Sequence, residues 1–232
     1  MTANFRKSSN HVKSILLIGF LIISGVGCNG IMNSNSSTAQ KGVFVDSPVK
    51  GLHYETETQT GTTDENGTFM YMPGETITFS IGDKTLGSAN AQSAITLIHM
   101  VKDAKDEKDP TVTNMGMLLQ SLDKDGNPDN GITITPEVSK AVSDANIDFH
   151  LSTTDFVNQP GMTKMFNAMN EKGLFPYGQC VMISPDDAQA HMKKYMMPCM
   201  NSIDYTSSAN TTSSTNTTMM CQGADKQTMM WP

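Results

Sequence analysis

Apolar and polar positions alternate along residues 41–92, a period of two that is typical of half-buried strands. In "GVFVDSPVKGLHYETET" the alternating apolar positions are Val43, Val45, Val49, Leu52 and Tyr54. Asn66-Gly67 stands before "FMYM" and predicts a hairpin turn. We therefore expect five or six short antiparallel strands in residues 41–93, forming a small β-sandwich or open barrel.

From Ala94 onward the spacing becomes helical. "AITLIHMVKDAKDE" predicts a first helix, and Asp109-Pro110 starts a second one as N-cap and first helical residue. Further helix starts are expected at Thr135-Pro136 and at Ser184, where Asp187 completes a capping box, and Gly173 is expected to end the helical stretch before it. The predicted fold class is α+β, with a β-sandwich module at 41–93 and a bundle of short helices at 94–200.

The N-terminus has the layout of a secretory signal. A basic start with Arg6, Lys7 and Lys13 is followed by the apolar run "ILLIGFLII" and by small residues ending in "GVGC". The apolar run is shorter than the ~18 residues of a membrane span. We expect a signal peptide over 1–27.

A Gly before Cys28 resembles the lipidation signal of bacterial lipoproteins, although Gly25 stands where those signals usually carry Leu. That resemblance implies a lipidated Cys28 as mature N-terminus, and Asn29 after it implies export to the outer membrane or cell surface. The alternative is an ordinary signal that is cleaved near Gly27 and leaves Cys28 as a free thiol. Residues 28–40 are polar and small and predict a flexible linker.

Charge excludes one class of partner. Removing the signal takes away three basic residues and no acidic one, so the formal net charge changes from −7 to −10. Such an acidic chain has no electrostatic attraction for nucleic acid. The expected partners are the membrane, through the lipid anchor, and a protein or carbohydrate at the cell surface.

Two stretches resemble a known family. "VDSPVKGLHYET" followed by "GTTDENGTFMYMPGETITF" resembles the carboxypeptidase-regulatory-like, transthyretin-type β modules of bacterial surface lipoproteins. "NMGMLLQSLDKDGNPDNGI" and "SPDDAQAHM" resemble the helical segment that follows such modules. The resemblance implies a structural, adhesive or binding role in the envelope rather than catalysis. The acidic residues of the β motif, which we expect to form turns, are Asp46, Asp64, Glu65 and Glu75.

The stretch "LDKDGNPDNGITI" has two interpretations. Asp123, Asp125 and Asn127 have the alternate spacing of calcium ligands, with Asp129 or Asn130 as a further oxygen donor. The EF-hand pattern is absent, because Pro128 and Ile134 occupy its glycine and glutamate positions. The other interpretation is a turn after a helix, with Gly126 in the left-handed conformation.

Methionine and cysteine suggest further chemistry near the C-terminus. "HMKKYMMPCM", "TTMMCQ" and "TMMWP" crowd soft ligands that would suit Cu(I), although Met also fills irregular cores. Met115, Met117, Met162, Met165 and Met169 have helical spacing and predict core positions.

Three cysteines remain if Cys28 is lipidated. We predict a disulfide between Cys180 and Cys199, which flank the last helix, while Cys221 could pair with either of them. Residues 201–232 are low in complexity, and we expect them to be disordered.

No enzyme motif is found. His53, His99, His150 and His191 are scattered, and none shares a recognisable motif with a Ser, Cys or Glu. We expect His191 to be packed or at the surface rather than a catalytic base. The sequence therefore predicts a lipid-anchored envelope protein that is not an enzyme. A calcium- or copper-binding envelope protein is the alternative.

Overall fold

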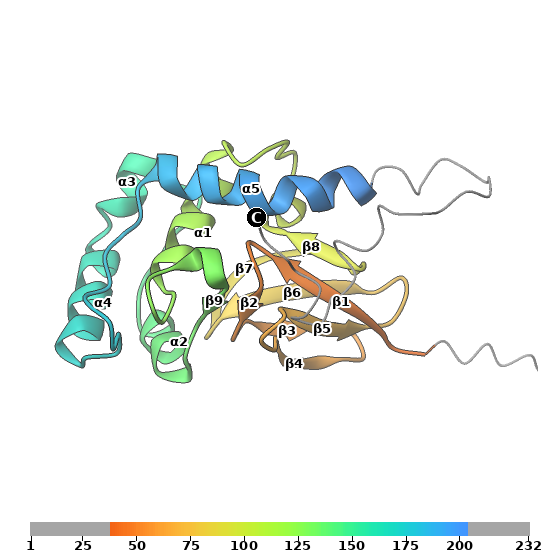
Figure 1. Ribbon diagram of the computed structural model, residues 1–232, viewed down its shortest axis with the longest axis horizontal. Helices are drawn as coiled ribbons and strands as arrows, with labels where there is room; N and C mark the ends of the chain where they lie inside the picture. Colours follow the sequence, from red (N-terminus) through yellow and green to blue (C-terminus); the bar gives the residue numbers. More distant parts are fainter. Residues whose placement is uncertain (1–37, 204–232) are drawn as a thin grey trace, which may run out of the picture. The chain divides into compact units, whose positions relative to one another are not determined.

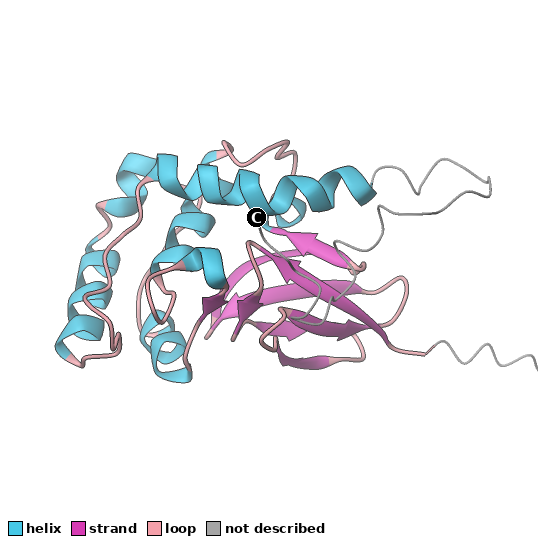
Figure 2. Ribbon diagram, viewed as in Figure 1, coloured by secondary structure: helices cyan, strands magenta, loops and turns pink. Residues whose placement is uncertain are grey.

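The computed structural model describes residues 38–203, with side chains up to residue 196, and places eight strands before the first helix and a ninth among the helices (Figures 1 and 2). The strands are β1 (Gln40–Val45), β2 (Val49–Lys50), β3 (His53–Glu55), β4 (Thr60–Thr62), β5 (Thr68–Tyr71), β6 (Thr76–Ile81), β7 (Lys84–Asn90), β8 (Ala94–Thr96) and β9 (Ile132–Thr133). The helices are η1 (Leu97–Met100), α1 (Pro110–Ser121), η2 (Pro128–Asn130), α2 (Pro136–Ser143), α3 (Thr153–Val157), α4 (Pro160–Glu171) and α5 (Pro185–Ile203). The α+β class is confirmed.

Three sheets organise the strands. Their orders are β5-β1-β8, β4-β3-β6-β7 and β2-β9. β1 is antiparallel to β5 and parallel to β8. On β1 the fully buried residue is Phe44, while Val43 and Val45 are half-buried. The prediction of a strand here is right, but the residue that enters the core is the aromatic one between the two valines.

The helix predicted over residues 94–107 is wrong. Ala94–Thr96 is strand β8, paired with Val43 to Val45, and only the short 3₁₀ helix η1 follows. All three residues of β8 are buried, and a short apolar run buried on both faces has no distinguishing period. β8 therefore joins β1 in one sheet although it lies beyond residue 93.

The turn at Asn66-Gly67 forms, but it does not close a hairpin. Gly67 has φ +72°, and the Asp64 carboxylate accepts hydrogen bonds from the backbone N–H groups of Asn66 and Thr68, both at 2.9 Å. β4 pairs with β3, whereas β5 pairs with β1. The turn thus carries the chain from one sheet to another.

The other predicted helix starts, and the helix end at Gly173, are confirmed. The Asp109 carboxylate accepts from the N–H groups of Thr111 and Val112, and the Thr135 hydroxyl accepts from that of Val138. Ser184 Oγ accepts from the N–H of Asp187 at 3.1 Å and contacts its carboxylate at 2.6 Å. Gly173, at φ +62°, follows the end of α4.

The core continues from the sheets into the helices. Phe44 and Phe79 pack edge to face with ring centroids 4.8 Å apart, and Phe69 packs on Phe79 at 5.3 Å. The methionines predicted to fill the core are all buried, namely Met115, Met117, Met162, Met165 and Met169. All described residues belong to one compact unit, and β9, from the helical half, pairs with β2.

Several predicted features lie outside the described residues. They are the signal peptide, the lipidation site Cys28, most of the linker over 28–40, Cys221 and the tail from residue 204 onward. They stay predictions.

Candidate functional site

The quoted stretches that carry the family resemblance meet in one polar cluster, of which four members are buried and Asp129 is exposed. Asp46 lies in the turn directly after β1, Gln120 lies on α1, Asp129 lies in η2, and His191 and Tyr195 lie on α5. We call these five residues the junction cluster. Because it draws on four elements, it connects the sheets to the helices.

Asp46 is the most deeply buried member. Its side chain has no solvent exposure, and the Nε2 of Gln120 donates to both carboxylate oxygens, at 3.2 and 3.0 Å. The same nitrogen also contacts the backbone oxygen of Ala188 at 3.3 Å. Gln120 therefore ties the end of β1 to the start of α5.

His191 lies between two acidic residues. Its Nε2 is 3.3 Å from the backbone oxygen of Asp46 and 3.6 Å from the Asp46 carboxylate, while its Nδ1 is 3.2 Å from the carboxylate of Asp129. Lys194 and the Tyr195 hydroxyl donate to Asp129, at 3.2 and 3.1 Å. The His191 and Tyr195 rings are in contact, with centroids 4.6 Å apart. His191 is packed, as predicted, but in an ionic network.

The environment shifts the acidity of both carboxylates, in opposite directions. Burial is the largest effect on Asp46 and raises its pKa to about 6, although the charge of His191 and the hydrogen bond from Gln120 oppose the rise. At Asp129 burial also acts to raise the pKa, but hydrogen bonds from Lys194 and Tyr195 outweigh it and lower the value. Burial thus destabilises the ionised form of Asp46, whereas the hydrogen bonds stabilise the ionised form of Asp129.

The backbone beside Asp46 is constrained. Ser47 is buried and has φ +56°, a left-handed conformation that few residues other than glycine adopt. Its hydroxyl donates to the backbone oxygen of Pro128 at 2.8 Å. This bond holds the turn after β1 against η2 and brings Asp46 and Asp129 to the same helix.

The loop proposed as a calcium site is closed by its own side chains. Asp123 is 2% exposed, and its two carboxylate oxygens accept from the N–H groups of Thr133, at 2.8 Å, and Asn127, at 2.9 Å. Asp125 accepts from the N–H of Asn127 at 2.9 Å and from the side chain of Asn130 at 3.1 Å. Gly126 has the expected left-handed conformation, with φ +73°.

Asp123 and Asp125 influence each other's ionisation. Burial raises the pKa of Asp123 to about 6, backbone hydrogen bonds offset part of that rise, and the Asp125 carboxylate adds to it. The hydrogen bond with Asp123 is the main cause of a lowered pKa at Asp125. Asp125 therefore has the lower pKa of the two groups.

The geometry favours the turn over the calcium loop. Asp123, Asp125, Asn127 and Asn130 are brought together, whereas both carboxylate oxygens of Asp129 face α5. Backbone donors already occupy the Asp123 carboxylate. In the described part of the chain, no group of three or more His, Cys, Asp or Glu side chains is arranged to hold a metal ion. Calcium binding by this loop stays a prediction of the sequence.

Cys180 is a buried free thiol whose Sγ donates to the backbone oxygen of Ser121 at 2.8 Å. Burial raises its pKa to about 12, and a protonated thiol is a poor nucleophile and metal ligand. The side chain of Cys199 is not among those described, so the disulfide stays a prediction. Met192 and Met196, from the segment considered for copper, are fully buried.

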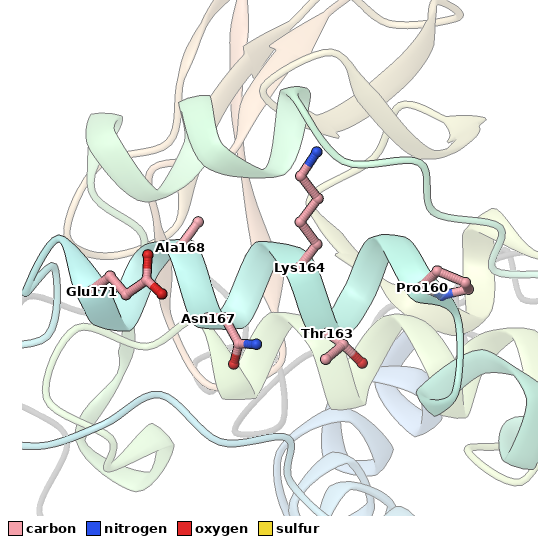
Figure 3. Close-up of a pocket in the computed structure, with 6 residues that line it drawn as sticks. All are labelled: Pro160, Thr163, Lys164, Asn167, Ala168 and Glu171. Atoms are coloured by element: carbon pink, nitrogen blue, oxygen red, sulfur yellow. The ribbon is translucent and has the colours of Figure 1, made fainter.

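A surface depression along α4 does not have the composition of a ligand site. It has a volume of about 670 Å³ and is lined by Pro160, Thr163, Lys164, Asn167, Ala168 and Glu171 (Figure 3). All six residues come from one helix, and functional groups from other elements do not line it. Converging polar groups from several elements mark most ligand sites, so this depression is not the candidate.

The other acidic motif residues form turns, as predicted. Asp64 caps the turn that ends at Thr68, and Glu75 accepts from the N–H of Met72 at 2.7 Å. Glu65 pairs with Lys50 at 3.0 Å on the surface. Asp46 also lies in a turn, but its carboxylate is buried in the junction cluster and accepts from Gln120. The sequence contained its partners in the quoted stretches, but no spacing rule connects residues 145 positions apart.

Comparisons with protein-family models, with curated proteins and with solved structures found no match. Among residues 38–203, no helix is both long and apolar enough to cross a membrane.

Proposed function

We propose that the chain is a lipid-anchored protein of the cell envelope with a structural or adhesive role. The observation that carries the proposal is the N-terminal pattern, a basic start and a short apolar run that ends in "GVGC" at Cys28. Stable anchoring needs two or more acyl chains, and a lipidated N-terminal cysteine would supply them. The resemblance to transthyretin-type β modules, and with it the β-sandwich, belongs to the same proposal.

Replacing the anchor residue tests the location. In cells that express the full chain, Cys28→Ser should move the protein from the membrane fraction to the soluble fraction, because the hydrophobic anchor is lost. Cys221→Ser is the matched control and should stay in the membrane fraction. Membrane association that is the same in Cys28→Ser and wild type would contradict lipid anchoring.

A loop between α4 and α5 supports a binding role. Tyr177 and Val181 are 79% and 67% exposed, and in the described part of the chain they are the exposed large hydrophobic residues. Leu174, Phe175 and Met182 beside them are half-buried and pack against the core. Exposed apolar side chains that gather in one segment are typical of contact surfaces. We propose that residues 174–183 contact a protein or carbohydrate partner.

The loop can be changed without touching the core. Tyr177→Ser combined with Val181→Ser should lower binding of the purified protein to whole cells or to extracted surface material by tenfold or more. The melting temperature should change by less than about 2 °C, since exposed substitutions alter stability little. Thr163→Ser with Asn167→Ser on α4 is the control. Unchanged binding by the loop variant would exclude this surface.

A further inference from the structure

Both ring nitrogens of His191 face oxygen acceptors. Nδ1 lies 3.2 Å from an Asp129 carboxylate oxygen, and Nε2 lies 3.3 Å from the backbone oxygen of Asp46. An ionised carboxylate and a backbone carbonyl have no proton to donate to a ring nitrogen. A neutral imidazole has one N–H group, whereas the imidazolium has two. The geometry therefore fits a doubly protonated His191.

We propose that the contact of His191 with Asp46 and Asp129 is a pH-sensitive latch, which holds α5 against the end of β1 more tightly at pH 5 than at pH 7.5. The charged and titratable groups that face His191 are Asp46 from the turn after β1, Asp129 from η2, and Lys194 and Tyr195 from α5. Gln120, from α1, is neutral. The latch is independent of the proposed envelope location.

Burial and hydrogen bonding favour the same form of the cluster. When Asp46 ionises, a carboxylate without solvent exposure gains a charge that burial disfavours. An imidazole with a single N–H group would present a lone pair to one of the two acceptor oxygens. Asp129 remains ionised at pH 5, because its neighbours lower its pKa. Burial of Asp46 outweighs the charge of His191 and the hydrogen bond from Gln120, which both favour the ionised carboxylate, so the acidic form of the cluster is the more stable one.

The sign follows from linkage. The folded-state pKa of Asp46 is raised from 3.8 to about 6, so the stability that its protonation contributes is present at low pH and is lost as pH rises through about 6. For a group shifted by that amount, the equilibrium for opening should change by about tenfold between pH 5.0 and 7.5. Ala188, Met192 and Met196 are also buried on α5, so the latch alters how often α5 opens and leaves the folded structure in place.

Hydrogen exchange of the full chain tests the latch. After correction for intrinsic exchange rates, the amides of α5 should be protected about tenfold more at pH 5.0 than at pH 7.5. Amides of α4 serve as the internal reference, because α4 does not contact the cluster and reports any change in global stability, including that caused by Asp123. The ratio of α5 to α4 protection is the quantity compared.

Asp46→Asn removes the titrating group but keeps an oxygen that can accept from Gln120. It should reduce the change in the α5-to-α4 ratio to less than about threefold. An equal ratio at both pH values in the wild type, or an undiminished change in Asp46→Asn, would overturn the latch. A carbon NMR titration of the wild-type Asp46 carboxyl needs no variant, and a midpoint near 3.8 would also overturn it.

Discussion

Gly51→Ala should lower the free energy of unfolding by about 3 kcal/mol or more. Gly51 has φ +97°, which costs an L-residue about 1–2 kcal/mol. A Cβ atom there would also lie 2.1 Å from the backbone oxygen of Ile134. Since that oxygen belongs to the segment that pairs β9 with β2, the clash can be relieved only by moving one backbone away from the other.

Gly74→Ala is the matched control. Gly74 has a similar φ of +91°, but nothing lies within 4 Å of the position of its added Cβ. The control therefore isolates the conformational cost, and thermal denaturation should show a fall of about 2–4 °C per kcal/mol lost. We expect a fall of at least about 6 °C for Gly51→Ala and a markedly smaller one for Gly74→Ala. Equal falls would mean that the close approach to Ile134 contributes nothing.

Local chemistry made the helix starts predictable. Asp109 with Pro110, and Ser184 with Asp187, satisfy or remove backbone N–H groups within the first turn. The information needed to place each start lies within a few residues. The same holds for Gly173, whose left-handed conformation follows the end of α4, and for Gly126, which has that conformation in the turn beyond α1.

Partners distant in the sequence limited the rest of the fold prediction. β8 has three residues, and its pairing with β1 joins positions about 50 residues apart, such as Val43 and Ala94. Asn66-Gly67 predicted a turn correctly, but the choice of partner for β4 and β5 depends on which sheet buries each strand. Neither strand pairing can be read from a short stretch of the sequence.

The junction cluster was not predictable from spacing for the same reason. Asp46 was expected to form a turn, and His191 was expected to be packed or exposed. Their contact depends on the Ser47 turn docking on Pro128, and on α5 lying against α1. The loop at 123–130 could be recognised as a closely spaced set of oxygen donors. Only the structure shows that backbone N–H groups occupy the Asp123 carboxylate.

Asp123→Ala should have the second large effect, a loss of about 2 kcal/mol of unfolding free energy. The substitution leaves the N–H group of Thr133 without its acceptor, whereas the N–H group of Asn127 keeps its bond to Asp125. A backbone group left unsatisfied in this way costs about 1–3 kcal/mol. Thr133 belongs to β9, so the loss should also loosen the pairing with β2. Urea denaturation of the variant and the wild type measures the difference.

Asp125→Ala is the control within the same loop. Asp125 is exposed, and Gly126 and Pro128 still shape the turn, so we expect a loss below about 1 kcal/mol. If the two variants lose equal stability, Asp123 is not the residue that closes the loop.

Millimolar calcium, added in the same melting experiments, separates the turn from a metal site. A bound ion raises the melting temperature by mass action, and the repulsion between Asp123 and Asp125 would then be relieved. The turn requires no ion, because backbone N–H groups already donate hydrogen bonds to both oxygens of the Asp123 carboxylate. We therefore expect no shift in the wild type. A rise that Asp125→Ala abolishes would show that calcium occupies the loop.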